Sequence, residues 1–285
     1  MRVLIVYPIL AREIPLMEQR LRLSLENIKT IKTMEVFHLF IVQDEPYIIP
    51  PDWKMSNSDI IFLEDKAVSF ARNAGLDYAE NGKFDYLLYH ESSIIFSDGF
   101  CTFIDSASRE TRDLIYTGRV VWTLPESSPL ILGTEEEKPN ILKNSCVCCY
   151  LLPVKLIRGL RFTTKVGPGK ITAIKAGEDT NFLVDFFKQN KSYKIIHSQN
   201  AILYHPPRPT DGSKHLFYSR GQGAMYRHFL SEKTLGYGVL TYFFLFWGNT
   251  ILRVLLFRKN ARKIFMERAR GFFSKDYLLF RADSK

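Results

Sequence analysis

The sequence predicts an α/β domain with a mostly parallel central sheet flanked by helices, followed by a basic helical extension. Apolar, strand-like runs alternate with helix-like segments in the first part of the chain, which is the pattern of parallel α/β proteins. Residues 211–285 hold 14 Lys and Arg against 5 Asp and Glu, whereas residues 1–210 hold 25 basic and 25 acidic residues. We therefore expect a domain over 1–210 and a separate helical region over 211–285.

The first ninety residues alternate strands and helices. Residues 2–9 are nearly all apolar, as in a strand covered on both faces, and the run is too short for a signal peptide. An amphipathic helix is expected over the residues that follow. The further strands expected are 36–42, 60–63 and 86–89, and the further helix is 67–79.

Beyond Asp98 we expect a helix, then strands near 115–123 and 145–152. Residues 123–140 are rich in Pro, Ser and Glu, which indicates an exposed loop. A glycine-rich loop then leads to Glu178 and Asp179 at the start of a helix. Its Phe and Leu residues recur at one-face spacing. A short strand follows and ends at Tyr204–His205.

The four cysteines, Cys101, Cys146, Cys148 and Cys149, include no C-x-x-C pair and no spacing typical of a zinc site. This usage favours buried thiols in a reducing compartment over a metal site, and so a cytoplasmic protein.

The region after residue 211 has features of a membrane-surface segment. Residues 235–257 are almost wholly apolar, but Asn249 and Arg253 interrupt them, which disfavours a transmembrane span. A basic stretch follows, in which Phe257, Ala261, Ile264, Phe265 and Phe272 share one helical face. A basic amphipathic helix beside an aromatic run is typical of an interfacial membrane anchor. The alternative is a helical cap that packs on the domain.

Four blocks of residues resemble family 2 glycosyltransferases with the GT-A fold, particularly those that build bacterial surface polysaccharides. They are Tyr7–Pro8 after the first strand, Asp44–Glu45 after the second, the S-x-A-R-N-x-G-L pattern at 69–76, and the stretch 167–207, which contains the glycine-rich loop, G-E-D-T-N and His205. The match covers nearly the whole chain and includes the R-G-Q-G-A-M-Y-R-H stretch near the C-terminus.

The resemblance implies that Tyr7, Pro8, Asp44, Glu45, Arg72 and Asn73 bind a nucleotide-sugar donor. An acidic side chain at a strand end can accept hydrogen bonds from base N–H groups or ribose hydroxyls, which is the role implied for Asp44. A guanidinium suits the geometry of phosphate, which is the role implied for Arg72. The alternative for Arg72 and Asn73 is an ordinary surface helix.

The resemblance also implies that Asp179 is the base that takes the proton of the acceptor hydroxyl, with Glu178 as an orienting or acceptor-binding neighbour. The alternative is that both are acids stabilised by the dipole of their helix.

The chain departs from the family pattern at the metal site. Family members carry D-x-D after the fourth strand, whereas this chain has Glu91-Ser92-Ser93. Glu91, Ser93 and His205 are the ligands expected for Mn²⁺ or Mg²⁺. Two alternatives stay open: the charge of the leaving group is met by Lys170, Arg208 or Arg220, or the chain does not catalyse.

Together, the residues and the resemblance predict an inverting glycosyltransferase. It would move a sugar, most plausibly from a UDP-sugar, to a lipid-linked or polysaccharide acceptor, as a cytoplasmic protein peripheral to the inner face of the membrane. The alternative is a pseudo-enzyme that binds a nucleotide sugar or serves as an assembly subunit. Nucleic-acid binding is disfavoured, because the basic residues alternate with a long apolar run.

Overall fold

The computed structural model describes residues 1–45, 50, 53, 56–109, 114–125, 141–142, 145–192, 194–207, 209–232 and 236–281. The chain forms two compact units. Unit 1 comprises residues 1–66, 70–160 and 190–207, and unit 2 comprises 67–69, 161–189 and 208–285. This division differs from the expected boundary at residue 210, because the glycine-rich loop and the helix that begins at Glu178 join the C-terminal helices.

Unit 1 is built on one sheet which, in the described part of the chain, has the strand order β3-β2-β1-β4-β7-β6-β8-β5. The strands are β1 (Arg2–Leu10), β2 (Glu35–Gln43), β3 (Ser58–Leu63), β4 (Tyr86–Tyr89), β5 (Ile95–Phe96), β6 (Ile115–Val121), β7 (Tyr150–Pro153) and β8 (Ile195–Tyr204). The strand expected over 145–152 begins instead with a 3-10 turn, η5 (Val147–Cys149). The other expected strands are confirmed within a few residues.

The pairing of the strands brings the carboxyl ends of most of them to one edge of the sheet. β1 pairs in parallel with β2 and β4, and β2 with β3. β7 is antiparallel to both β4 and β6, so β4 and β6 run the same way, and β8 is parallel to β6. Residues that follow β2, β4 and β8 therefore lie along the same edge.

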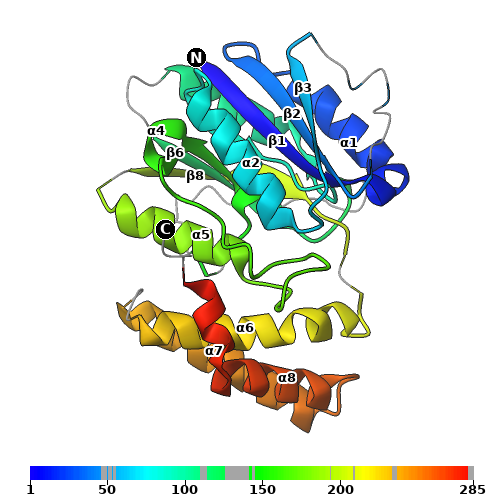
Figure 1. Cartoon of the computed structure of the whole chain (residues 1–285), viewed down its shortest axis with the longest axis vertical. Coiled ribbons are helices and arrows are strands. Elements are labelled where there is room, and N and C mark those ends of the chain that lie inside the picture. Colours follow the sequence, from blue (N-terminus) through cyan, green and yellow to red (C-terminus); the bar gives the residue numbers. More distant parts are fainter. Residues whose placement is uncertain are drawn as a thin grey trace. The chain divides into compact units, whose positions relative to one another are not determined.

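The helices of unit 1 are α1 (Ile14–Ile28), α2 (Val68–Asn81), which starts in unit 2, α3 (Asp98–Asp105) and the single turn α4 (Val154–Ile157). In Figure 1, α2 crosses in front of β1; a Cβ added at Gly75 of α2 would lie 2.8 Å from a methyl of Val6. α1 is joined to β5 by Ser24, whose hydroxyl accepts from the N–H of Phe96 at 3.0 Å. Apolar helix faces thus cover the strands, as the sequence pattern predicts.

Unit 2 contains α5 (Glu178–Gln189), α6 (Ser213–Ser231), α7 (Gly236–Leu255), α8 (Ala261–Phe273) and the 3-10 helix η6 (Lys275–Phe280) (Figure 1). α6 and α8 pack backbone against backbone. A Cβ on Gly223 would overlap the carbonyl oxygen of Arg268, and one on Gly271 would overlap that of Arg220. These contacts explain one glycine of the R-G-Q-G-A stretch as a packing requirement.

The prediction of one apolar face on the basic helix is partly wrong. Ala261 and Ile264 of α8 are buried, but Phe257 precedes the helix and is 82% exposed. The buried stripe of α8 continues instead through Arg268. Within the described residues, no helix combines the length and apolar character needed to cross a bilayer.

All four cysteines are free thiols; the expectation of buried thiols is confirmed for Cys101, Cys148 and Cys149, whereas Cys146 is half-buried. Burial raises the pKa of Cys101 to about 12.

Candidate functional site

The acidic residue after β2 is held in a strained conformation. Asp44 has a φ of 91°, in the left-handed region that non-glycine residues rarely adopt. Its carboxylate forms an ion pair with Lys66, and its side chain is 9% exposed. Glu45, the next residue, is exposed. The fold therefore fixes the Asp44 carboxylate at the carboxyl edge of the sheet. Sequence reasoning missed Lys66, because its partner lies 22 residues earlier in the chain.

Tyr7 is a core residue of unit 1. The sequence places Tyr7 and Pro8 after the first strand, but β1 continues to Leu10, so this part of the prediction is wrong. The Tyr7 hydroxyl lies 2.8 Å from Nδ1 of His38, its ring stacks on Phe40, and the residue is 1% exposed. This position gives Tyr7 a packing role, and the donor contacts of Tyr7 and Pro8 stay predictions.

Arg72 and Asn73 lie in the second turn of α2. Arg72 is buried, with 5% exposure, so the alternative of an ordinary surface position is wrong for it. Its carbonyl oxygen accepts a hydrogen bond from the Tyr89 hydroxyl at 2.9 Å, which ties α2 to the end of β4. Asn73 is half-buried. Their role in donor binding stays a prediction.

Three predicted metal-site residues come together at the carboxyl edge of the sheet. Ser93 Oγ lies 3.1 Å from Oε1 of Glu91 and 3.0 Å from Nε2 of His205. The His205 and Glu91 side chains are 3.9 Å apart. The register explains this grouping: β5 pairs antiparallel with β8, with Ile95 opposite Tyr204, so the residues just outside these strands meet.

The imidazole of His205 is held on several sides. It is 5% exposed, its ring centroid is 4.2 Å from that of Trp122, and Nδ1 lies 2.8 Å from the carbonyl oxygen of Pro206. A carbonyl oxygen can only accept, so Nδ1 donates to Pro206, and Nε2 is the ring nitrogen that faces Ser93 and Glu91. In its neutral form, a ring held in this orientation can bind a cation through Nε2.

The carboxyl group of Glu13 interacts electrostatically with this cluster. Burial raises the pKa of Glu13, at the end of the 3-10 turn η1 (Ala11–Glu13), and the charge of Glu91 adds to the rise. Sequence reasoning missed both Glu13 and Trp122, since neither lies in a recognisable motif. Among the described residues, no group of three or more His, Cys, Asp or Glu side chains has the arrangement of a metal site.

Unit 2 holds the acidic pair. Glu178 and Asp179 occupy the first turn of α5, as expected, and follow Gly177, whose φ is 104°. Glu178 is buried and Asp179 is half-buried. Gly167, at φ 105°, faces Glu178, and a Cβ added there would lie 3.0 Å from its Cδ. The glycine-rich loop thus closes over Glu178 and leaves Asp179 the more accessible of the two.

Lys175 and Ser69 hold the glycine-rich loop in shape. The Lys175 ammonium donates to the carbonyl oxygens of Gly169 at 2.5 Å and Thr172 at 2.7 Å, and to the Thr172 hydroxyl at 3.2 Å. The buried Ser69 hydroxyl donates to the carbonyl oxygen of Val166 at 3.1 Å. The Ser of the S-x-A-R-N-x-G-L pattern therefore positions the loop that precedes Asp179.

The cations proposed to replace a metal have different surroundings. Lys170 is exposed on the glycine-rich loop. Arg220 forms a two-point ion pair with Asp276, through Nε at 2.6 Å and a terminal nitrogen at 3.3 Å. Arg208 lies outside the described residues, as does most of the loop expected over 123–140.

Comparison with known proteins rests on structure alone. No family model matches the chain. No curated protein matches it in sequence. Among solved structures, TarS from S. aureus (residues 1–349) superposes with a TM-score of 0.52 at 14% identity, over 79% of this chain and 65% of TarS 1–349. The complex of TarS 1–349 with UDP-GlcNAc gives a TM-score of 0.54 at 14% identity, over 79% and 66%.

The chain spans about two thirds of TarS 1–349, and 40% of a longer TarS structure that matches with a TM-score of 0.53 at 11% identity. At this identity the likeness concerns architecture. The mostly parallel sheet, its flanking helices and the C-terminal helices together show that this chain has the GT-A fold.

Proposed function

We propose that this protein is a glycosyltransferase that moves a sugar from a UDP-sugar to an acceptor hydroxyl with inversion at the anomeric carbon. The observation that carries the proposal is the cluster of Glu91, Ser93 and His205 at the carboxyl edge of a GT-A sheet. The strained Asp44 follows a strand that ends at the same edge. Solved structures of TarS, which has the same fold, contain UDP and UDP-GlcNAc.

Each donor-side residue has a part in this proposal. Asp44, pinned by Lys66, accepts hydrogen bonds from the base or ribose of the donor. Glu45, Pro8, Arg72 and Asn73 complete the donor site, which the buried Tyr7 supports from the core. Arg72, whose carbonyl oxygen is bonded to Tyr89 at the end of β4, carries a guanidinium that suits a diphosphate.

The Glu91 cluster fits a divalent cation that is shared with the donor. One carboxylate, one hydroxyl and one imidazole nitrogen are ligands that Mn²⁺ accepts, and Mg²⁺ is often held by one or two carboxylates together with phosphates and waters. When bound, such a cation would neutralise charge on the leaving diphosphate. Glu91, Ser93 and His205 would hold it.

Asp179 is the proposed base. Its carboxylate takes the proton of the acceptor hydroxyl while that oxygen forms a bond to the anomeric carbon. The bond from that carbon to the diphosphate oxygen breaks, and its electron pair leaves with UDP. Glu178, buried behind Asp179 in the first turn of α5, orients this end of the helix. The helix dipole favours the ionised form that a base requires.

Hydrolysis and transfer by the purified protein test this function. UDP-sugars are supplied with Mn²⁺, Mg²⁺ or EDTA, and release of UDP is measured with and without candidate glycan or lipid-linked acceptors. We expect Asp179→Asn to lower transfer roughly a hundred-fold or more while UDP still binds. Transfer by Asp179→Asn at the wild-type rate would contradict the assignment of the base.

One observation favours a second function. The Glu91 cluster contains a single carboxylate, and fewer anionic ligands weaken the hold on a hard cation. The alternative is therefore a pseudo-enzyme that binds a nucleotide sugar and serves as a partner subunit. Calorimetry that detects UDP-sugar binding, combined with no release of UDP under any of the conditions above, would select this function.

The proposed acceptor is lipid-linked or polysaccharide, and the outer face of α7 supports a location at the inner membrane surface. Exposed apolar side chains lie along much of its length. They are Leu240, Phe244, Leu245, Ile251, Leu252 and Leu255, with Leu256 directly after the helix. Residues 233–266 contain no Asp or Glu but six Lys and Arg, so the charge around this face complements anionic lipid.

Vesicle co-sedimentation tests the membrane contact. We expect the protein to sediment with phosphatidylglycerol vesicles more than with phosphatidylcholine vesicles, and Leu252→Glu with Leu255→Glu to abolish this binding. The matched control replaces two exposed leucines of α1, Leu16→Glu with Leu23→Glu, and should bind as the wild type does. Equal binding of both double variants would exclude α7 as the contact.

A further inference from the structure

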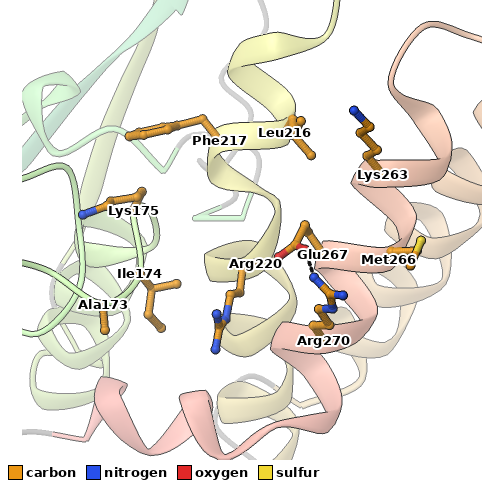
Figure 2. Close-up of a pocket in the computed structure, with 10 residues that line it drawn as sticks. All are labelled: Ala173, Ile174, Lys175, Leu216, Phe217, Arg220, Lys263, Met266, Glu267 and Arg270. Atoms are coloured by element: carbon orange, nitrogen blue, oxygen red, sulfur yellow. Dashed lines mark hydrogen bonds and ion pairs between the residues drawn. The ribbon is translucent and has the colours of Figure 1, made fainter.

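An open pocket of about 470 Å³ lies within unit 2, between the segment 173–175, α6 and α8. Figure 2 shows Arg220 projecting from α6 between Ile174 and Arg270. We call it the α6–α8 pocket. Of its lining residues, Arg220 is an alternative cation for the leaving group, and no other is assigned above to donor binding or to the acceptor base.

The rim of the pocket is cationic. Arg220, Lys263 and Arg270 line it and are exposed, against one lining acid, Glu267. Arg270 pairs with Glu267 at 2.5 Å through one nitrogen. Arg220 uses Nε and one terminal nitrogen on Asp276, which leaves part of its five-donor guanidinium for a ligand. Lys263 adds a full positive charge.

The pocket also has an apolar wall. Ile174, Leu216, Phe217 and Met266 line it, and Phe217 and Met266 are 53% and 54% exposed. The ammonium group of Lys175, the fourth lining cation, donates its hydrogen bonds to the glycine-rich loop. Lys263 and the remaining guanidinium donors of Arg220 and Arg270, beside exposed apolar side chains, suit an anion attached to an apolar group.

The pocket is built on the segment that leads to Asp179. A Cβ added at Gly221 of α6 would lie 2.8 Å from the carbonyl oxygen of Ala176, so α6 packs tightly against this segment. Ile174 and Lys175 precede Asp179 by only five and four residues, and all of these residues belong to unit 2. A ligand held here is therefore attached to the part of the chain that carries the proposed base.

We propose that the α6–α8 pocket binds a phosphate group joined to an apolar moiety, as part of the acceptor. The assignment to the acceptor rests on the proposed function of Asp179. It narrows the acceptor to a phosphate-bearing class, as distinct from a neutral glycan.

Calorimetric titration tests the pocket without any sugar donor. The probes are octyl phosphate, inorganic phosphate and 1-octanol, with UDP as a separate titrant. We expect octyl phosphate to bind more tightly than either half alone. The double variant Lys263→Gln with Arg270→Gln should lower the affinity for octyl phosphate roughly ten-fold. The control, Lys32→Gln with Lys191→Gln, removes two exposed charges from unit 1 and should bind as the wild type does.

Three results would overturn the proposal. They are equal binding of octyl phosphate by the pocket variant and the wild type, equal binding of octyl phosphate and 1-octanol, and a loss of UDP affinity in the pocket variant as large as its loss of octyl phosphate affinity. The last would make the pocket a donor site. Failure of the proposed function can be distinguished from failure of the pocket proposal. In that case sugar transfer is absent, but octyl phosphate still binds more tightly than inorganic phosphate or 1-octanol.

Discussion

The Ser93 hydroxyl lies 3.0 Å from Nε2 of His205, although 112 residues separate the two in the chain. The pairing of β5 with β8 is what brings them together. Since Nδ1 of His205 faces the carbonyl oxygen of Pro206, Nε2 is the nitrogen that the ring presents to Ser93 and Glu91. The geometry makes Nε2 of His205 the nitrogen ligand of the proposed cation site.

His205→Ala should therefore weaken binding of UDP in the presence of Mn²⁺ by roughly ten-fold or more, because it removes a directed ligand. Ser93→Ala should have a smaller effect, of a few-fold, because the hydroxyl chiefly orients its neighbours. Calorimetry with UDP and MnCl₂ measures both. His197→Asn, a change on the same strand upstream, serves as the control, and an unchanged UDP affinity in His205→Ala would refute the role.

A second prediction concerns Gly167. Alanine at this position meets two obstacles: a φ of 105°, and a Cβ placed 3.0 Å from Cδ of Glu178. We expect Gly167→Ala to cost about 1–2 kcal/mol of stability and to lower transfer by displacing Glu178.

Gly159 provides the matched control for Gly167. Its φ is 76°, but a Cβ there would have no neighbour within 4 Å. Gly159→Ala therefore carries backbone strain without the contact, and it should lose stability with little change in transfer rate. Thermal unfolding and UDP release separate the two effects. If both variants transferred sugar at the same rate, the Gly167–Glu178 contact would have no functional role.

The sequence could predict much of this fold, because apolar runs and helical periodicity report burial directly. The strand ends were less predictable: β1 runs on past Tyr7 because β2 continues to pair with it up to Leu10, although its pairing with β4 stops at Val6. For the site, the sequence could predict only that its residues follow strands whose carboxyl ends lie along one edge of the sheet. The partner of Asp44, Lys66, and the grouping of Ser93 with His205 depend on register between strands, which no local pattern encodes.

The stability of unit 2 should depend on pH through His228. This histidine is 6% exposed, and burial, the largest cause, lowers its pKa from 6.5 to about 4. The unfolded chain takes up a proton near pH 6.5, but the folded chain does so only near pH 4. Between these values the unfolded state binds more protons, so stability falls as the pH falls, by about 2 kcal/mol at pH 5.

His228→Phe should remove this contribution while keeping a ring beside Phe280. Urea unfolding at pH 7.5 and pH 5.0 measures it, because the difference between the two pH values should shrink by about 2 kcal/mol in the variant. The comparison at pH 7.5, where the histidine is neutral in both states, isolates any packing effect. An identical pH dependence of the unfolding free energy in the two proteins would show that His228 does not cause it.

The last prediction concerns Arg268, a charged residue in the buried stripe of α8. It is 6% exposed, and burial lowers its pKa to about 10, so it stays charged at neutral pH. It donates to the Gln222 side chain of α6 at 2.8 and 3.2 Å and to the Thr250 hydroxyl of α7, and its guanidinium carbon lies 4.1 Å from the centroid of the Phe246 ring. One side chain thus joins three helices.

Arg268→Ala should destabilise unit 2 by about 2–4 kcal/mol. It removes the buried aliphatic stem and also the N–H groups that donate to Gln222 and Thr250. Arg268→Met keeps most of the stem and should cost less. Arg262→Ala, at an exposed position of the same helix, should change stability by no more than about 0.5 kcal/mol. Chemical denaturation measures all three. If Arg268→Ala proved as stable as Arg262→Ala, the helices would be held by their glycine contacts and apolar packing alone.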